Sequence, residues 1–191
     1  MKTKQMALIA LLSAIEIVLF LTPLGFILIG PIRITTLHIP VIFASLFLGW
    51  KYGLFLGFLF SVLSFTSNLI APTVFSFIFN PFVEVGLFKG NIFSLVIVLV
   101  PRLIFPLVAY WCYYKFKLSL FISVLASTLS HSLLVMGMIF IFFASPYMAI
   151  TNSSFSTFAT IILTTIFING TLEAIIGMLL IVPLFKRLRK E

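Results

Sequence analysis

Apolar residues follow one another along this chain in long runs, and short breaks with charges, proline, glycine or asparagine separate the runs. A helix that crosses a bilayer needs about 20 apolar residues, and proline and glycine punctuate such runs. The pattern therefore predicts an all-α membrane protein with six transmembrane helices. The predicted spans cover about residues 6–22, 37–50, 53–70, 91–113, 118–144 and 158–185, with loops over about 23–36, 73–90 and 145–157. The second span is short, at roughly 20 Å.

The composition agrees with this pattern and excludes other classes of protein. Of the 191 residues, 62% are hydrophobic and only 8% are charged, whereas soluble domains carry about 25% charged residues. This length holds a single membrane domain, residues 1–191, so we exclude water-soluble enzymes and nucleic-acid-binding proteins. The single cysteine, Cys112, excludes an internal disulfide, and two histidines are too sparse for a metal site.

The basic residues predict how the chain is oriented in the membrane. If the N-terminus is cytoplasmic, nine of the twelve Lys and Arg residues fall on inner segments, and only Arg33 and Lys89 fall on outer loops. Lys and Arg resist translocation, so both termini are predicted to be cytoplasmic. The net charge of +8 thus records topology rather than an acidic partner. The remaining cation, Arg102, lies inside the fourth span.

Four ionisable residues lie near the middle of predicted spans: Glu16, Arg102, His131 and Glu173. Such residues are costly at membrane depth, so they face the bundle interior and are candidates for function. One interpretation is structural, in which Arg102 pairs with Glu173 or Glu16 and holds the bundle together. In the other interpretation these groups contact a ligand. Both interpretations stay open at this point.

Polar side chains form stripes on three of the predicted helices. The stripes are Ser61, Ser64 and Asn68 in the third span, Ser123, Ser127 and His131 in the fifth, and Thr165, Asn169 and Glu173 in the sixth. Residues at these spacings share one helix face. They indicate either hydrogen bonds between helices or one polar cavity that opens outward and holds a small hydrophilic molecule. Breaks in the helix backbone, expected at Pro101 and at Asn169–Gly170, favour the cavity.

Several catalytic motifs are missing from the sequence. It contains no Gly-x-x-x-x-Gly-Lys-Ser/Thr segment, so we do not expect the chain to hydrolyse ATP. It also lacks His-Glu-x-x-His, Gly-x-Ser-x-Gly and paired aspartates, which disfavours an intramembrane enzyme. An autonomous secondary transporter or channel is an alternative, in which Glu16 and Glu173 would relay protons.

Several segments spread along the chain have a recognisable pattern. They include the small-residue pair Ala10-x-x-x-Ala14, the run TPLGFILIGPIRITTLHIP at 22–40, LGWKYG at 48–53, PR at 101–102, LLVM at 133–136 and NGTLE at 169–173. With these segments and six spans, the chain resembles the substrate-binding S components of energy-coupling factor (ECF) vitamin transporters. Within that family it is similar to the pantothenate-type subgroup, and carriers of hydroxymethylpyrimidine or pyridoxine are close relatives.

The resemblance implies vitamin uptake across a bacterial plasma membrane. Family members bind a water-soluble vitamin at the outer side and deliver it with an EcfT-type transmembrane coupling protein and two cytoplasmic ABC-type ATPases. On this chain, Ala10 and Ala14 would contact the coupling protein, and the loop with Gly30, Pro31 and Arg33 would form a lid. The candidate substrate-binding residues are Arg102, His131, Asn169, Asn68, Asn80 and His38. The resemblance implies no cofactor and no metal.

Arg102 separates two alternatives for the vitamin. Pantothenate is a carboxylate, and a buried carboxylate favours an arginine fork. Since Arg102 is the only cation deep in the predicted bundle, an anionic substrate is favoured. If Glu173 or Glu16 neutralises Arg102, the pocket instead suits a neutral pyrimidine or pyridine that stacks on aromatic rings. The Ser-His-Ser segment at 130–132 departs from the amide-rich patch expected of the subgroup, so substrate choice can differ.

Overall fold

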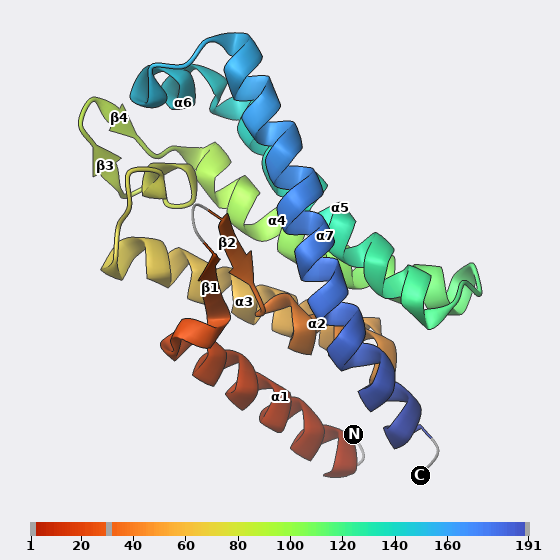
Figure 1. The fold of residues 1–191 in the computed structure, drawn as a ribbon. Helices are drawn as coiled ribbons and strands as arrows, with labels where there is room; N and C mark the ends of the chain where they lie inside the picture. The colour runs from red at the N-terminus through yellow and green to blue at the C-terminus, as the bar shows by residue number, and fades with distance from the viewer. Residues whose placement is uncertain (1–2, 30–31, 190–191) are drawn as a thin grey trace.

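The computed structural model describes residues 3–29 and 32–189, and for 26–29 and 32–34 it describes the backbone alone. Figure 1 shows a bundle of long helices joined by short strands and turns. The helices are α1 (Thr3–Leu21), α2 (His38–Phe47), α3 (Trp50–Ile70), α4 (Ile92–Tyr110), α5 (Leu120–Phe142), α6 (Ala144–Thr151) and α7 (Phe155–Leu188). The shorter elements are the 3-10 turns η1 (Pro23–Gly25) and η2 (Ser76–Ile78), the π-helical turn η3 (Trp111–Lys115) and the strands β1 (Phe26–Ile29), β2 (Ile32–Thr35), β3 (Glu84–Val85) and β4 (Phe88–Lys89).

In the described part of the chain, five helices are long and apolar enough to cross a membrane: α1, α3, α4 with η3, α5 and α7. They match five of the six predicted spans and confirm the all-helical membrane fold. The second predicted span is α2, a helix of ten residues, which is about 15 Å long and too short to cross a bilayer alone. Eight of its ten residues are buried, because α2 packs in the core between α1, α3, α4 and α7.

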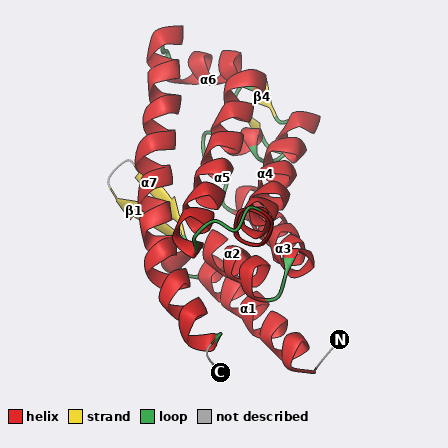
Figure 2. Ribbon diagram, turned by 90° about the vertical axis from the view of Figure 1, so that its right-hand side faces the viewer, coloured by secondary structure: helices red, strands yellow, loops and turns green. Residues whose placement is uncertain are grey.

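The long helices pack as neighbours around this core. α5 lies against both α4 and α7, while α3 lies against α2 and α4. α1 lies at the edge of the bundle against α2 and α3, and its only buried side chains are Leu12 and Glu16. Figure 2 shows α7 running the full height of the molecule, with α6 at one end. Both chain ends lie at the opposite end.

α4 contains two prolines and packs closely on α3. Pro101 and Pro106 have no N–H, so the carbonyls of Ile97 and Arg102 lose their partners within the helix. Gly57 of α3 lies against the second of these carbonyls, and a Cβ atom on Gly57 would be 2.2 Å from the Arg102 oxygen. α4 nevertheless continues through both prolines, so the predicted break at Pro101 is wrong.

α7 is likewise continuous through Asn169 and Gly170, where the sequence also predicts a break. Gly170 instead lets α5 approach, since a Cβ atom there would lie 3.2 Å from the Leu129 side chain and 3.3 Å from the Ser132 hydroxyl. A glycine inside a helix costs about 1 kcal/mol relative to alanine. The close packing of α5 on α7 offsets that cost, so the second predicted break is also wrong.

The predicted loop over residues 23–36 contains a β-hairpin. β1 pairs with β2 in antiparallel register, starting with Phe26 opposite Thr35. The hairpin bonds backbone groups that an irregular loop would leave without partners beside the membrane. The segment is therefore more regular than the sequence predicts.

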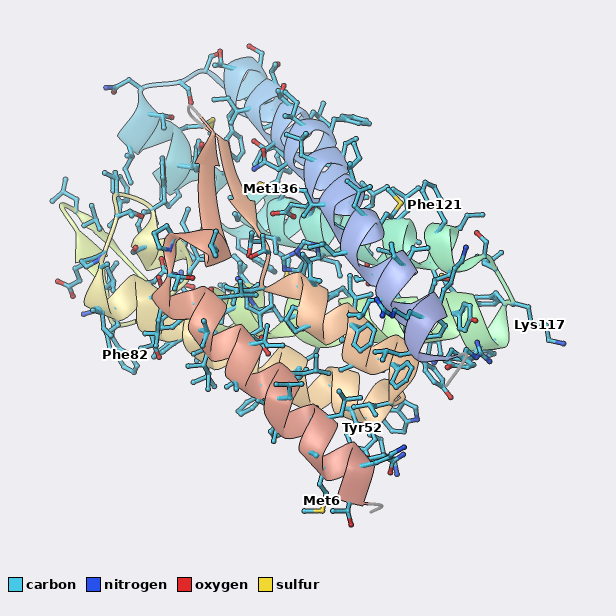
Figure 3. All side chains as sticks on the ribbon, turned by 60° about the horizontal axis from the view of Figure 1, so that its bottom comes forward. Met6, Tyr52, Phe82, Lys117, Phe121 and Met136 are labelled. Atoms are coloured by element: carbon cyan, nitrogen blue, oxygen red, sulfur yellow. The ribbon has the colours of Figure 1, made fainter. Side chains whose placement is uncertain are left out.

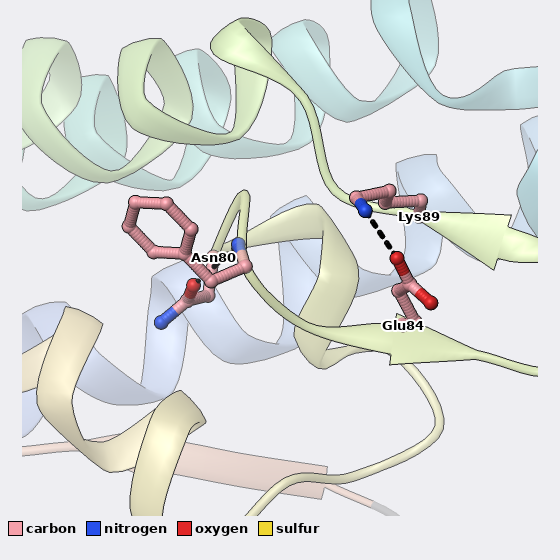
Figure 4. Close-up of polar contacts among 4 residues, drawn as sticks. Asn80, Glu84 and Lys89 are labelled. Carbon is pink, nitrogen blue, oxygen red and sulfur yellow. Dashed lines mark hydrogen bonds and ion pairs between the residues drawn. The ribbon is translucent and has the colours of Figure 1, made fainter.

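The other two predicted loops also contain regular structure. The segment 73–90 holds η2 and the hairpin β3–β4, in which Gly86 takes a positive φ of 59°. Figure 4 shows the ion pair between Glu84 and Lys89 that joins the two strands of this hairpin. The segment 145–157 holds most of α6, a helix of eight residues. These elements all lie at the end of the bundle away from the chain termini.

Candidate functional site

A polar cavity of about 140 Å³ lies inside the bundle, lined mainly by residues of α4, α5, α7 and β2. The lining residues are Thr35, Phe79, Arg102, His131, Ser132, Val135, Met136, Thr165, Asn169 and Glu173. The cavity brings together three of the six predicted substrate-binding residues, namely Arg102, His131 and Asn169. Thr165 and Glu173 join them from the polar stripe of α7. Of the three predicted polar stripes, the one on α7 and His131 of the one on α5 line this cavity, whereas the stripe on α3 and the two serines of α5 do not.

Arg102 is held in place from several sides. Its Nη1 atom donates to the carbonyls of Val98 at 2.9 Å and Ile97 at 3.3 Å, and its Nη2 atom donates to the Ser64 hydroxyl at 2.9 Å. The Ile97 carbonyl is the one that the first proline of α4 leaves without an N–H. The guanidinium carbon lies 4.7 Å from the centre of the Phe60 ring, in cation–π range. These contacts fix the guanidinium before any ligand arrives.

The two buried glutamates do not pair with Arg102. Among the described residues, the only ion pair lies on the hairpin β3–β4. Glu173 lines the same cavity as Arg102, and its Oε1 atom accepts a hydrogen bond from the Thr35 N–H at 2.8 Å. Glu16 is fully buried on α1, and its oxygens have no hydrogen-bond partner among the described residues. The described residues thus form no structural ion pair at Arg102.

His131 lies against two phenylalanine rings on the cavity wall. Its ring centre is 5.0 Å from that of Phe105 and 5.9 Å from that of Phe60. In the described part of the chain, neither its Nε2 atom nor the Nε atom of Arg102 has a hydrogen-bond partner, and both atoms are buried. Buried polar atoms without partners are uncommon and call for an explanation. Both residues line the cavity, so a polar solute there would lie close to these atoms.

A larger, mostly apolar cavity of about 580 Å³ adjoins the polar one. The two cavities share Phe79, Met136, Thr165 and Asn169, and Figure 3 labels Met136 on α5. Tyr147 of α6 lines the larger cavity, and burial raises the pKa of its hydroxyl, which therefore stays protonated. Ligand pockets usually measure about 300–1,000 Å³. Together the two cavities offer that space, with polar groups deep inside and apolar groups toward α6.

Asn68 and Asn80 lie outside both cavities and hold the segment 73–90 against α3. Asn68 donates to the Ser64 carbonyl at 2.8 Å and accepts from the Ser76 hydroxyl at 2.9 Å. Asn80, labelled in Figure 4, donates to a backbone carbonyl of α3 at 3.2 Å and accepts from a backbone N–H two residues later at 2.9 Å. A side-chain amide both donates and accepts hydrogen bonds, so it can hold a connecting segment in place as well as bind a ligand.

His38 also lies outside both cavities. It is 1% exposed at the start of α2 and faces α7, where a Cβ atom on Gly177 would be 3.3 Å from its Nε2 atom. Gly177 thus leaves space on α7 for the imidazole ring. The structure therefore places three of the six predicted substrate-binding residues at the cavity, and His38, Asn68 and Asn80 elsewhere.

The predicted lid corresponds to the hairpin β1–β2. Gly30 and Pro31 lie outside the described residues, and Arg33 belongs to β2, where only the backbone is described. The end of the same strand contributes Thr35 to the cavity lining and binds Glu173 through its N–H. The hairpin is thus joined to α7 at the edge of the polar cavity.

The predicted interface with the coupling protein lies on the face of α1 that points away from the bundle. Ala10 and Ala14 are exposed, whereas Leu12 and Glu16 turn into the bundle. This arrangement follows from the helical period, since Glu16 is about 160° around the helix from Ala14. The two alanines are therefore free of the described bundle.

Sequence reasoning missed the apolar side of the polar cavity. Val135 and Met136 follow His131 and Ser132 by four residues, so helical spacing could have placed them on the same wall. Phe79 belongs to the connection after η2, and no pattern in the sequence marked it. Its position depends on how that connection folds back onto the bundle.

The fold and the cavity define a multi-pass membrane protein with an internal polar site. Residues 4–185 match the family described as "ECF transporter, substrate-specific component", and the chain belongs to this family. Over 188 residues it is 31% identical to the pantothenic acid transporter PanT of Lactococcus lactis subsp. cremoris (strain MG1363), covering 91% of this chain and 96% of the relative. The predicted resemblance to S components is confirmed. The chain is a component of a transporter and not an enzyme.

Proposed function

We propose that this chain binds pantothenate at the outer side of a bacterial plasma membrane and delivers it inward with an energy-coupling module. The module would comprise an EcfT-type coupling protein and two ABC-type ATPases, and membership of the ECF family supports it. The pantothenic acid transporter among its relatives supports the substrate. The observation that carries the proposal is Arg102, a buried cation on the cavity wall that meets no carboxylate at ion-pair distance among the described residues.

The chemistry of pantothenate matches the lining of the two cavities. Its carboxylate would accept from Arg102, since guanidinium groups bind carboxylates strongly in buried sites. Its amide and hydroxyl groups suit the polar residues of α7, Asn169 and Glu173. Its paired methyl groups suit the apolar wall of Val135 and Met136. The ligand would thus extend from the polar cavity into the apolar one.

We also propose six crossings with both termini in the cytoplasm. α2 and the hairpin before it would together form the short second crossing. The distribution of Lys and Arg supports this orientation. The chain ends lie at one end of the bundle, as an even number of crossings requires (Figure 1). The two cavities would then open toward the outer side, where α6 lies.

Arg102→Ala tests the proposed substrate. The variant should bind pantothenate more than about tenfold more weakly than wild type, because a hydrogen bond to a charged group contributes roughly 1.5–3 kcal/mol. Titration calorimetry on the purified chain measures the affinity. Panthenol, in which a hydroxyl replaces the carboxylate, serves as a second ligand that tests the role of the carboxylate. Wild type should prefer pantothenate to panthenol, and the variant should bind both alike.

Lys89→Ala is the matched control, since it removes an exposed cation from the hairpin β3–β4 and should leave affinity unchanged. Melting curves check that each variant is folded. If Arg102→Ala does not fold, the affinities of wild type for pantothenate and panthenol still show whether the carboxylate is recognised. Equal binding of pantothenate and panthenol by wild type, or full affinity in a folded Arg102→Ala variant, contradicts the proposal.

A neutral vitamin is the second candidate, because Glu173 lines the same cavity as Arg102 and could offset its charge. The ring of Phe79, which lines both cavities, would suit a pyrimidine or pyridine. Thermal-shift measurements against pantothenate, pyridoxine and hydroxymethylpyrimidine separate these ligands. Uptake into vesicles that contain this chain alone would instead indicate an autonomous transporter.

A further inference from the structure

A third cavity lies at the other end of the bundle, where the chain ends. Its volume is about 350 Å³, and Tyr113, Leu120, Phe185, Lys186 and Arg189 line it. It shares no lining residue with the two cavities described above. Two cations, two aromatic rings and an aliphatic side chain thus meet in one place that the proposed vitamin site does not use.

The inner wall of this basic–aromatic pocket is apolar and firmly packed. Phe185 is 3% exposed and Leu120 is 9% exposed. The Tyr113 ring packs edge-on against Phe185, with ring centres 5.5 Å apart. Phe47 of α2 also packs edge-on against Phe185, with ring centres 5.9 Å apart. The pocket therefore has a rigid apolar wall, which suits hydrocarbon.

The rim of the pocket is positively charged. Arg189 donates to the Tyr113 hydroxyl, and its guanidinium carbon lies 5.7 Å from the Tyr113 ring centre and 5.6 Å from that of Phe185. Lys186 lies three residues earlier on α7, on the same side of the helix. Among the described residues neither cation has a carboxylate partner, since the one ion pair is on β3–β4. The pocket is thus suited to an anion.

Tryptophan and tyrosine residues gather at the helix ends beside this pocket. Trp50 and Tyr52 lie in the first turn of α3. Tyr110 is the last residue of α4, and Trp111 and Tyr114 lie in η3, which follows it. Tyr114 also donates to a backbone carbonyl of α2 at 2.7 Å, which ties these ends together. Trp and Tyr are enriched where a membrane meets water. A cavity beside them would therefore lie near the phosphate groups of the bilayer.

We propose that the basic–aromatic pocket binds the phosphate group of an anionic phospholipid. Arg189 and Lys186 would donate to the phosphate oxygens, and the hydrocarbon near the glycerol would lie along Leu120 and Phe185. A free phosphate ion would satisfy the cations but not the apolar wall. That difference favours a lipid over a soluble anion.

The variant Lys186→Gln with Arg189→Gln tests the pocket. Native mass spectrometry of the purified full chain with added phosphatidylglycerol measures retained lipid. The double variant should bind phosphatidylglycerol about tenfold or more weakly than wild type, the loss expected for charged contacts. The matched control is Lys117→Gln with Arg187→Gln, which removes the same charge from exposed positions that do not line the pocket.

Two further measurements, with phosphatidylcholine and with inorganic phosphate, identify the class of ligand. Phosphatidylcholine, which has a phosphate but no net charge, should bind more weakly than phosphatidylglycerol, and inorganic phosphate should not displace the lipid. Equal loss in the two double variants, equal binding of the two lipids, or displacement by inorganic phosphate would overturn the proposal. Unchanged melting temperature and pantothenate affinity in the pocket variant show that the fold is intact.

Discussion

At the scale of single residues, each proline of α4 leaves one backbone carbonyl without its usual N–H partner in the helix. The carbonyl freed by Pro101 accepts from Arg102, and the carbonyl freed by Pro106 faces Gly57 of α3. Without its contact to Arg102, the Ile97 carbonyl would be unpaired in an apolar environment. Pro101 therefore supplies an acceptor that helps to position the cation of the proposed site.

Gly57→Ala should destabilise the protein. The added Cβ atom would lie 2.2 Å from the Arg102 carbonyl oxygen, so α3 and α4 must separate. Overpacking of this kind costs about 1–3 kcal/mol, which lowers the midpoint of thermal unfolding. Gly137→Ala on α5 is the control, since its Cβ atom meets nothing within 4 Å. Equal midpoints for the two variants would count against the tight contact of α3 with α4.

Side-chain chemistry explains which site residues the sequence could predict. A charged or ring-nitrogen side chain at membrane depth has few structural uses, so Arg102 and His131 stood out and both line the cavity. Amides near helix ends have many structural uses, and Asn68 and Asn80 bind backbone groups instead. Asn169 differs from them by lying at the centre of a long helix.

At the scale of elements, the hairpin β1–β2 covers the cavity edge, and a side-chain hydrogen bond joins it to α7. That contact runs from the Thr35 N–H to Glu173, residues that are 138 positions apart in the sequence. Residues 26–35 resemble a membrane-side loop in the sequence, because two four-residue strands are too short for a clear alternating pattern. Only the pairing of the strands and the contact with α7 reveal the hairpin.

Glu173→Ala should loosen the hairpin. Without the carboxylate oxygen, the Thr35 N–H loses its acceptor, and a hydrogen bond to a charged group contributes about 1.5–3 kcal/mol. Amide hydrogen exchange over residues 32–36 of the ligand-free protein should then be about tenfold faster or more. Glu173→Gln keeps an acceptor oxygen but not the charge, so its exchange should be slower than that of the alanine variant and faster than that of wild type. Similar exchange in the alanine and glutamine variants would argue against this contact as the hairpin's tether.

At the scale of the whole molecule, the ligand cavity and the proposed partner surface are separate. The polar cavity lies among α4, α5 and α7, whereas Ala10 and Ala14 lie on the outer side of α1 at the bundle edge. Hydropathy predicts the five long helices of the described residues, because each apolar run must be buried or face lipid, but it also predicts a span at α2, which is too short to cross a bilayer alone. How short α2 packs inside the bundle follows from tertiary contacts that hydropathy does not encode.

Ala14→Trp should separate assembly from ligand binding. The indole would project from the exposed side of α1 and block close approach of a coupling-protein helix, while pantothenate affinity stays unchanged. Co-purification with the coupling protein and calorimetry measure the two effects. Ile15→Trp is the matched control, because Ile15 is 41% exposed and lies about 100° around the helix. Equal recovery of the complex with both variants would contradict the alanine interface.

The contacts of Arg102 also bear on how the protein is made. A charged side chain that enters the bilayer during synthesis must be solvated at that moment. Two of its acceptors, Ile97 and Val98, belong to its own helix, and the third, Ser64, lies on α3, which the ribosome completes first. Every hydrogen-bond acceptor of the guanidinium is thus already synthesised when Arg102 itself leaves the ribosome. α4 can therefore insert with its charge already solvated, ahead of α5 and α7.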